Sequence, residues 1–376
     1  MPLLDAIRFA TLAVLVANTL CVAGLIVLKA VNRSRRLRKE AAKSSHMRLI
    51  SRHVSFDHCT DPIPDDAASD PAFLEALVDV RNALAGSELE RLERIMDRHG
   101  VVDRQVAHLQ AEFPRARRLQ AAMALAELGG HSTAPVLVAH LDDREPEVRV
   151  QAARGLARMR WTPAIDEIVS RFGTETPWVR SRFADTLVGF GSAATGPLVA
   201  YVRINHRHET VGPVAAIRNL AAIGDDQAVR PLMELLGTDP ATEVRIATIE
   251  ALGLLANPTS APALRTEARH ADWRIRAKAA TALGELRDTG SLDLLANSLT
   301  DPAWWVRRNS AAALAAIPGG TALLYEALSS ADRFAADAAA EALVDMGELA
   351  ASRQRQAEGS GGSRERALIG HMEARA

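Results

Sequence analysis

The 376-residue sequence has little cysteine and few aromatic residues. Its two cysteines, of which Cys21 lies in an apolar run, argue against a disulfide framework and against a cysteine-based zinc site. Aromatic residues make up only 4% of the chain, and alanine and leucine dominate its 48% hydrophobic content. Because strand-forming residues are scarce, the composition favours helices over sheets.

No charged side chain occurs between residues 9 and 28 (FATLAVLVANTLCVAGLIVL). As a helix these twenty residues would span about 30 Å, the thickness of the hydrocarbon core of a bilayer. Only Arg8 immediately precedes the segment and a basic cluster follows it, the reverse of the order in a cleaved signal peptide. The cluster comprises Lys29, Arg33, Arg35, Arg36, Arg38, Lys39 and Lys43. The positive-inside rule predicts a transmembrane anchor in residues 1–28, with the N-terminus outside and the remainder in the cytoplasm.

The net charge of −1 conceals an excess of acid in most of the chain. Ten of the 45 Lys and Arg residues, but only two of the 46 Asp and Glu residues, precede residue 53. The remainder has 35 basic and 44 acidic residues, a net charge of −9 with histidine neutral. This acidity argues against a nucleic-acid partner, since phosphates require a basic surface. Residues 29–70 are expected to be a basic juxtamembrane segment that contacts anionic lipid, becoming an irregular linker from residue 51.

One sequence pattern recurs along most of the chain. The segments EPEVRVQAARGLARM (145–159), ATEVRIATIEALGLL (241–255) and AWWVRRNSAAALAAI (303–317) share it. Its marker arginines are Arg118, Arg149, Arg180, Arg245, Arg276 and Arg307, and Gly212 and Ala336 take the marker position in two further copies. Each unit reads as an alanine-rich first helix, a break containing Gly or Pro, and a second helix. One unit cannot bury its own apolar face, so the repeat predicts an all-α solenoid of about seven to eight helical pairs after the transmembrane helix.

The pattern resembles the bacterial HEAT-repeat family of the PBS-lyase-HEAT-like kind, over residues 113–347. Three copies carry an aspartate six residues before the marker, and the resemblance implies that such Asp and Arg side chains bridge adjacent repeats. That role is expected of the pairs Asp143–Arg149, Asp239–Arg245 and Asp301–Arg307, in a ladder that includes Arg180 and Arg276. Gly212 and Ala336 should interrupt the ladder. Residues 71–112 are expected to form N-terminal capping helices, and residues 348–376 a flexible tail.

No constellation in the sequence indicates catalysis, a cofactor or a metal. Metal-ligating residue types gather, without a second ligand pair, at His53, Asp57, His58 and Cys59. Iron-binding deoxyhypusine hydroxylases of HEAT type use several His-Glu pairs, whereas this chain has one, His208-Glu209. We therefore expect a protein that is not an enzyme. A lyase-type or ligand-handling HEAT enzyme that uses its concave face is the alternative.

The sequence indicates a non-catalytic scaffold or adaptor, tethered to the bacterial inner membrane, whose solenoid binds a protein partner. In solenoids of this kind the second helices usually line the concave side. Candidate partner-binding residues at those positions are His140, Arg171, Arg203, Glu234, Arg265 and Arg269. Four tryptophans recur just before marker arginines, either as hydrophobic caps between neighbouring turns or as an aromatic ridge for a partner. They are Trp178, Trp273, Trp304 and Trp305.

The chain has one anchor, a basic cluster from Lys29 to Lys43 that we call the basic neck, and an alanine-rich array. This layout also resembles that of bacterial membrane-tethered HEAT proteins. Some of these accompany membrane glycosyltransferases of the polysaccharide-synthase kind. The resemblance therefore implies a membrane-associated protein partner. The bilayer itself would be contacted through residues 9–28 and the basic neck.

Overall fold

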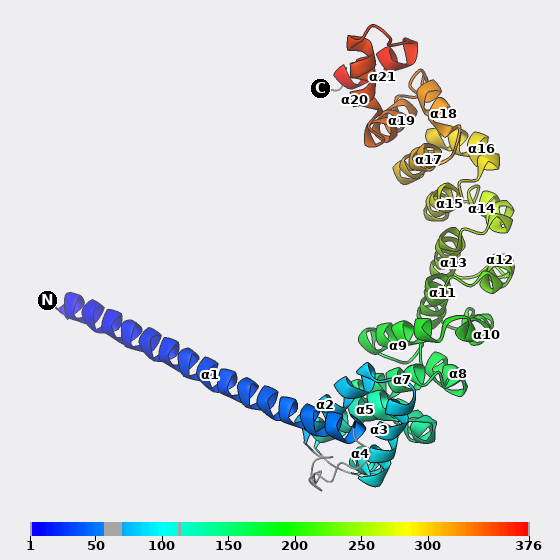
Figure 1. Ribbon diagram of the computed structural model, residues 1–376. Coiled ribbons are helices and arrows are strands. Elements are labelled where there is room, and N and C mark those ends of the chain that lie inside the picture. The colour runs from blue at the N-terminus through cyan, green and yellow to red at the C-terminus, as the bar shows by residue number, and fades with distance from the viewer. Residues whose placement is uncertain (1, 56–69, 112–113, 375–376) are drawn as a thin grey trace. The chain divides into compact units, whose positions relative to one another are not determined.

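The computed structural model describes residues 2–55, 70–111 and 114–374, and the side chains of residues 1–24, 26 and 131 lie outside the description. Every regular element in these ranges is a helix. The chain divides into two compact units, Met1–Gly155 and Leu156–Ala376 (Figure 1). The all-helical architecture that the sequence predicts is confirmed.

The first unit is organised around one long helix, α1 (Pro2–Ser55). The C-terminal end of α1 packs against α2 (Pro71–Ala83) and α3 (Ser87–Arg98). Ile50 and Val54, one helical turn apart, are buried there with Phe73 of α2. The prediction of irregular structure from residue 51 is therefore wrong for residues 51–55. The helix continues to Ser55 because Ile50 and Val54 are buried against α2 and α3. The rest of the predicted linker, residues 56–69, lies outside the described residues.

The basic neck that the sequence predicts is divided into two parts on α1. Lys39 and Lys43 form ion pairs with Glu75 and Asp79 of α2, with N–O distances of 2.6 and 2.5 Å. Nearer the N-terminus, the basic side chains from residue 29 to Arg38 are exposed. Lys39 and Lys43 thus bind α2, whereas the basic residues from Lys29 to Arg38 remain on the surface.

The predicted transmembrane segment lies within α1, but the side chains of residues 1–24 are outside the described ones, so the anchor stays a prediction. Among the residues whose side chains are described, one stretch is long and apolar enough to cross a membrane, Pro177–Asn205. It comprises two helices of one repeat, α9 (Pro177–Phe190) and α10 (Thr195–Asn205), joined by a 3-10 turn. Its Phe183 and Leu198 are fully buried, so part of its apolar surface belongs to the core of the array.

The first unit ends with repeat helices. α4 (Val101–Gln110) packs along α5 (Arg115–Leu128), so residues 101–110, expected to be part of the cap, form a helical pair with the array. After α5 come a short helix, α6 (Ala134–Ala139), and then α7 (Pro146–Arg158).

The second unit is two rows of helices (Figure 1). The first-helix row carries the marker positions and consists of α9, α11 (Val211–Ile223), α13 (Thr242–Leu255), α15 (Trp273–Glu285), α17 (Trp304–Ala316) and α19 (Arg333–Asp345). The second-helix row consists of α8 (Ile165–Ser170), α10, α12 (Val229–Leu236), α14 (Ala261–Glu267), α16 (Leu292–Asn297) and α18 (Gly320–Ala327). The two rows run side by side along the unit.

The first-helix row is the more closely packed of the two. Gly284 of α15 lies so near α17 that a Cβ there would be 2.8 Å from the Cα of Ala313 and 2.9 Å from its Cβ. Gly253 of α13 approaches Ala282 of α15 in the same way, at 2.9 to 3.0 Å. Neighbouring first helices consequently contact one another more extensively than neighbouring second helices do. The second unit curves with the first-helix row on its inner side (Figure 1).

This curvature corrects the expectation that the second helices line the concave side. Small residues allow the first helices to approach at backbone distance, and the row with the shorter spacing lies on the inside of a curved stack. The residues chosen from the second helices therefore lie away from the inner side within this unit.

The C-terminal segment is folded onto the array. α20 (Glu348–Ala357) and α21 (Ser363–Glu373) pack against α19 and α18, and Leu368 and Ile369 of α21 are buried. His371 Nε2 lies 3.0 Å from a carboxylate oxygen of Asp337 on α19. The prediction of a flexible tail from residue 348 is therefore wrong. The glycine-rich residues 359–362 form the turn between α20 and α21. Leu368 and Ile369 of α21 are buried and extend the hydrophobic core at the C-terminal end of the array.

Candidate functional site: an inner groove on the first-helix row

Marker arginines connect successive units within the array. Arg276 donates hydrogen bonds through Nε and Nη2 to both carboxylate oxygens of Asp301, at 2.8 and 2.9 Å. Arg118 donates through Nη2 to one carboxylate oxygen of Asp143, and both side chains are buried. Burial opposes ionisation of Asp301, yet the hydrogen bonds from Arg276 hold its pKa below the ordinary value. At these two aspartates, the carboxylate accepts from the marker arginine of the preceding unit.

This direction of pairing corrects two of the three expected pairs, Asp143–Arg149 and Asp301–Arg307, whereas the third, Asp239–Arg245, is confirmed. Within a copy, the recurrent bond is to the main chain. Arg149 and Arg307 donate to the backbone carbonyls of Asp143 and Asp301, at 2.8 and 2.7 Å. Arg276 likewise donates to the carbonyl of His270, at 2.9 Å. The carbonyl six residues before the marker is therefore used whatever side chain stands there.

Two copies depart from this arrangement for identifiable reasons. Arg245 pairs with Asp239 of its own copy at 2.7 Å and with buried Glu267 at 2.8 Å, because the next copy has His270 in the aspartate position. At Gly212, the hydroxyl of Tyr201 and the carboxylate of Glu209 fill the space that a side chain would need. Tyr201 donates to Glu209 at 2.6 Å. Arg180, the marker before that copy, donates to the backbone carbonyl of Glu175.

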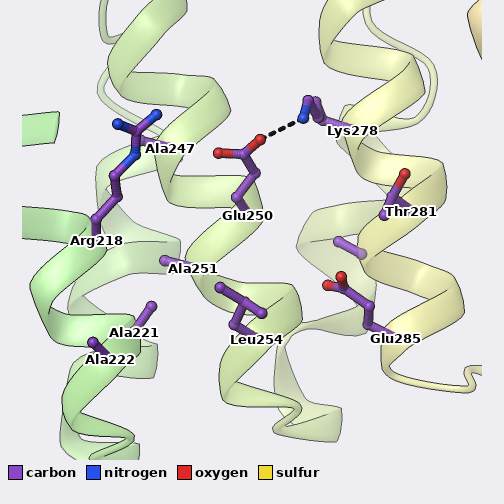
Figure 2. A pocket seen from close by; sticks show the side chains of 11 residues that line it. Arg218, Ala221, Ala222, Ala247, Glu250, Ala251, Leu254, Lys278, Thr281 and Glu285 are labelled. Atoms are coloured by element: carbon purple, nitrogen blue, oxygen red, sulfur yellow. Dashed lines mark ion pairs between the residues drawn. The ribbon is translucent and has the colours of Figure 1, made fainter.

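Two adjoining hollows lie along the inner side of the first-helix row, with volumes of about 620 and 690 Å³. The first is lined by α11, α13 and α15, and Figure 2 shows its alanine floor, which includes Ala222, Ala247 and Ala251. The second extends across α9, α11 and α13 and shares Arg218 and Ala222 with the first. We call the two together the inner groove. The alanines that let the helices pack closely also leave this surface concave.

Charged side chains of both signs stand around the floor of the inner groove. Lys278 forms an ion pair with Glu250 at 2.5 Å (Figure 2). Partial burial of the Glu285 carboxylate, reinforced by the negative charge of Glu250, raises the pKa of Glu285. Within the described part of the chain, neither Glu285 nor Arg218 forms an ion pair or a hydrogen bond. Beside them Leu254 is 66% exposed.

The shape and charges of the inner groove suit the binding of a macromolecule over an extended area rather than the holding of a metal ion. Among the described residues, no group of three or more His, Cys, Asp or Glu side chains is placed to hold a metal ion. The groove is open and elongated, with an apolar floor and two charged side chains, Arg218 and Glu285, that have no ion-pair partner among the described residues. Such a surface can bind the side chains of another protein through apolar contact and complementary charge.

The candidate residues on the second helices are engaged with other residues of the array. Arg203 pairs with Glu234 at 2.8 Å, and the pair flanks a hollow of about 180 Å³ between α10 and α12. Arg265 donates to both carboxylate oxygens of Asp288 at 2.6 and 2.8 Å. The remaining three are held locally: Arg171 pairs with Glu167 at 3.0 Å, Arg269 donates to the Arg265 carbonyl at 3.1 Å, and His140 Nδ1 lies 2.8 Å from the Val136 carbonyl oxygen. Of the five that lie in the second unit, the structure joins Arg203 to Glu234 and Arg269 to Arg265 and does not gather all five at one place.

The four candidate tryptophans are exposed, at the starts of α9, α15 and α17. Trp178, Trp304 and Trp305 are each 48% exposed and Trp273 is 42% exposed. Trp304 and Trp305 pack edge to face, with ring centroids 4.6 Å apart. Phe334, 55% exposed, occupies the same repeat position on α19 as Trp305 does on α17, and the sequence reasoning missed it. Phe334 could have been found from the sequence, because it lies two residues before the final marker position, Ala336, as Trp305 does before Arg307.

Solved structures of helical repeat proteins are similar to this chain. A chain from the complex of CpcE and CpcF of phycocyanin lyase from Nostoc sp. is 20% identical, with 70% of this chain and 98% of that chain covered and a TM-score of 0.32. Human deoxyhypusine hydroxylase in complex with glycerol is 18% identical, with 75% and 99% covered and a TM-score of 0.29. The karyopherin Kap121p bound to the extreme C-terminus of the protein phosphatase Cdc14p is 11% identical, with 80% and 41% covered and a TM-score of 0.50.

The comparison with curated proteins gave no match. The family model of HEAT repeats matches residues 102–187, 134–211, 203–269 and 265–344, which together make up more than half of the chain. These matches begin at α4 and end in α19. The chain belongs to the HEAT-repeat family.

Proposed function

We propose that this protein is a non-catalytic scaffold whose inner groove binds a segment of a protein partner. The observation that carries the proposal is the groove itself, an open apolar surface on the first-helix row with Arg218 and Glu285 at its edges. Kap121p, which shares the fold, has been solved bound to the C-terminus of Cdc14p and to Nup53p, and this supports protein binding as a use of such a solenoid.

The scaffold is tethered to the bacterial inner membrane through residues 9–28, with the N-terminus outside and the array in the cytoplasm. The continuity of α1 supports this arrangement, because the helix runs without a break from the apolar segment to the ion pairs of Lys39 and Lys43. Helix geometry sets Leu28 about 17 Å from Lys39 along the axis. A tether of this kind holds the first unit close to the membrane surface, with the exposed arginines near anionic headgroups.

The layout of anchor, neck and array favours a partner that itself resides in the membrane. A glycosyltransferase of polysaccharide synthesis is the narrower proposal, carried by the resemblance of that layout to other membrane-tethered HEAT proteins. Neither part of the proposal assigns a reaction to this chain.

The test is extraction of the tagged full-length protein in mild detergent, followed by mass spectrometry of the proteins that co-purify. A groove variant, Arg218→Glu with Leu254→Lys, changes two exposed side chains of the inner groove. The matched control, Arg203→Ala with Glu234→Ala, removes an exposed ion pair of the second-helix row. We expect a stoichiometric membrane protein that is lost from the groove variant and retained by the control.

Two results would contradict the proposal. Loss of the partner from the control but not from the groove variant would move the binding surface to the second helices. A full-length protein that emerges alone, carrying a tightly bound chromophore or other small molecule, would favour a lyase-type or ligand-handling role.

A further inference from the structure

Aromatic and arginine side chains gather at the starts of α17 and α19. Trp304 and Trp305 form an edge-to-face pair, and the guanidinium of Arg308 lies over the Trp304 ring at 5.6 Å. The guanidinium groups of two further arginines lie over Phe334, at 5.0 Å for Arg307 and 5.6 Å for Arg333. We call this set the C-terminal aromatic–arginine cluster: Trp304, Trp305, Arg307, Arg308, Arg333 and Phe334.

The cluster carries positive charge that no carboxylate in the described part of the chain neutralises. Within the described residues, neither Arg308 nor Arg333 forms an ion pair. The aspartates nearest to them in sequence are already engaged, since Asp301 accepts from Arg276 and Asp332 caps the N-terminus of α19. Both arginines are exposed, and so are the three aromatic rings. The cluster is therefore an accessible cationic surface in a region of the chain with net negative charge.

The other exposed tryptophans of the same repeat positions provide an internal comparison. Near Trp178, Arg182 pairs with Asp185 at 3.3 Å, and beside Trp273, Arg274 pairs with Asp272 at 2.6 Å. At those two places an aspartate of the chain neutralises the arginine next to the tryptophan. The repeat position therefore accounts for an exposed tryptophan, but it does not account for arginines left without a carboxylate.

We propose that the C-terminal aromatic–arginine cluster binds an acidic segment of a protein partner. The inference rests on the proposed scaffold function and names the chemistry of one partner segment. Carboxylates of that segment pair with Arg308 and Arg333, whose planar guanidinium groups present several donors in a fixed geometry. An apolar or aromatic side chain of the segment packs on the exposed rings, since Trp and Arg are the residues that most often anchor protein interfaces.

Fluorescence anisotropy with the full-length protein in nanodiscs of phosphatidylcholine tests the proposal. The probe is a labelled peptide, EEEFEEE, and its neutral counterpart is QQQFQQQ. We expect EEEFEEE to bind and Arg308→Glu with Arg333→Glu to weaken that binding by at least about tenfold, because reversed charges repel the carboxylates. Trp304→Ala should weaken it severalfold, and Trp178→Ala, equally exposed in the unmodified protein, should leave it unchanged.

Several results would overturn the proposal. Equal binding of QQQFQQQ, or no effect of the charge reversal, would show that carboxylate recognition does not occur at the cluster. Flotation with vesicles containing phosphatidylglycerol that depends on Arg308 and Arg333, without peptide binding, would assign the cluster to a lipid surface. Thermal unfolding of each variant, followed by circular dichroism, identifies a variant that has lost its fold; Trp304→Ala then supplies the test in place of the double variant.

The two proposals can fail separately. Loss of peptide binding to the cluster, with a co-purified partner still bound at the inner groove, would refute the cluster assignment and leave the scaffold function. Peptide binding by a protein that co-purifies no partner under any detergent condition would refute the scaffold function instead.

Discussion

The two helix rows of the second unit differ in how closely the helices of successive units approach one another. In the second-helix row, charged side chains of successive units reach one another, as Arg203 reaches Glu234 and Arg265 reaches Asp288. The first-helix row also has an ion pair between successive units, Lys278–Glu250, but there glycine and alanine bring the backbones together, as Gly284 and Ala313 do. The charged pairs can tolerate variable spacing, whereas backbone contact cannot. The comparison teaches that the row which sets the curvature is also the row that carries the groove.

Among the substitutions that test this comparison, Asp301→Ala is expected to have the largest effect on stability. It removes both hydrogen bonds to Arg276 and leaves a largely buried guanidinium without its carboxylate. We expect the local free energy of opening of α15 and α17 to fall by about 3 kcal/mol, as for other broken ion pairs of low exposure. Hydrogen–deuterium exchange of the α15 and α17 amides measures this change.

The control for Asp301→Ala is Arg203→Ala, which removes one partner of an exposed pair in the second-helix row. Its effect should be below about 1 kcal/mol, since solvent and salt screen such pairs. Similar losses in the two variants would mean that the ladder of marker arginines is no more important to stability than a surface ion pair.

A smaller effect is expected from Gly284→Ala. The added Cβ would lie 2.8 Å from the Cα of Ala313, so α15 and α17 must separate. We expect a loss of about 2 kcal/mol, typical of overpacking, together with a lower affinity for the partner of the inner groove. Urea unfolding of the full-length protein measures the stability.

The matched variant for Gly284→Ala is Gly196→Ala in α10, where an added Cβ meets nothing within 4 Å. This variant should be neutral or stabilising by up to about 1 kcal/mol, because alanine favours the helix. Equal destabilisation by both substitutions would contradict the assignment of close packing to the first-helix row.

The smallest effect is expected from Glu285→Gln in the inner groove. The pKa of Glu285 is raised above its ordinary value of 4.5 by partial burial and by Glu250. The folded state therefore favours the protonated acid, and this contribution to stability is present below pH 4.5 and is lost as pH rises through the raised pKa. The variant should be more stable than the parent at pH 7, by less than about 0.5 kcal/mol because the carboxylate is part exposed and screened.

Urea unfolding at pH 7 and at pH 5 measures the advantage of Glu285→Gln, which should shrink at the lower pH. A variant less stable than the parent at pH 7 would show that the Glu285 carboxylate has a stabilising partner. Comparison of the partner affinities of Glu285→Gln and the parent protein shows whether the negative charge of Glu285 contributes to binding in the inner groove.

Much of the fold could be predicted from the sequence because the repeat reports it directly. The recurrence of Arg149, Arg245 and Arg307 in one frame identifies helical pairs, and the need to bury their apolar faces requires a stack. The direction in which Asp301 pairs could not be predicted, since two arginines, one unit apart, are equally compatible with its position. The helices of residues 348–376 were missed because two apolar residues, Leu368 and Ile369, give a weak periodic signal.

The concave side was assigned to the wrong row for a related reason. A repeat has no marked beginning, so the sequence alone does not say which of its two helices faces the inside of the curve. The close approach of Gly253 to Ala282 settles this, and it depends on residues 29 positions apart in the chain. The tryptophans were found because they stand in the repeat frame. Arg308, which lies over the Trp304 ring, and Arg333, which lies over Phe334, were not singled out.

The sequence by itself determined that this protein is an array of helical pairs with polar residues that recur at most of the turns, because local periodicity and the repeat specify both. Only the tertiary structure decided which row packs closely, where the groove lies, and which arginines are left without a carboxylate. These depend on distances between side chains of different units, and such distances arise from stacking rather than from the local pattern.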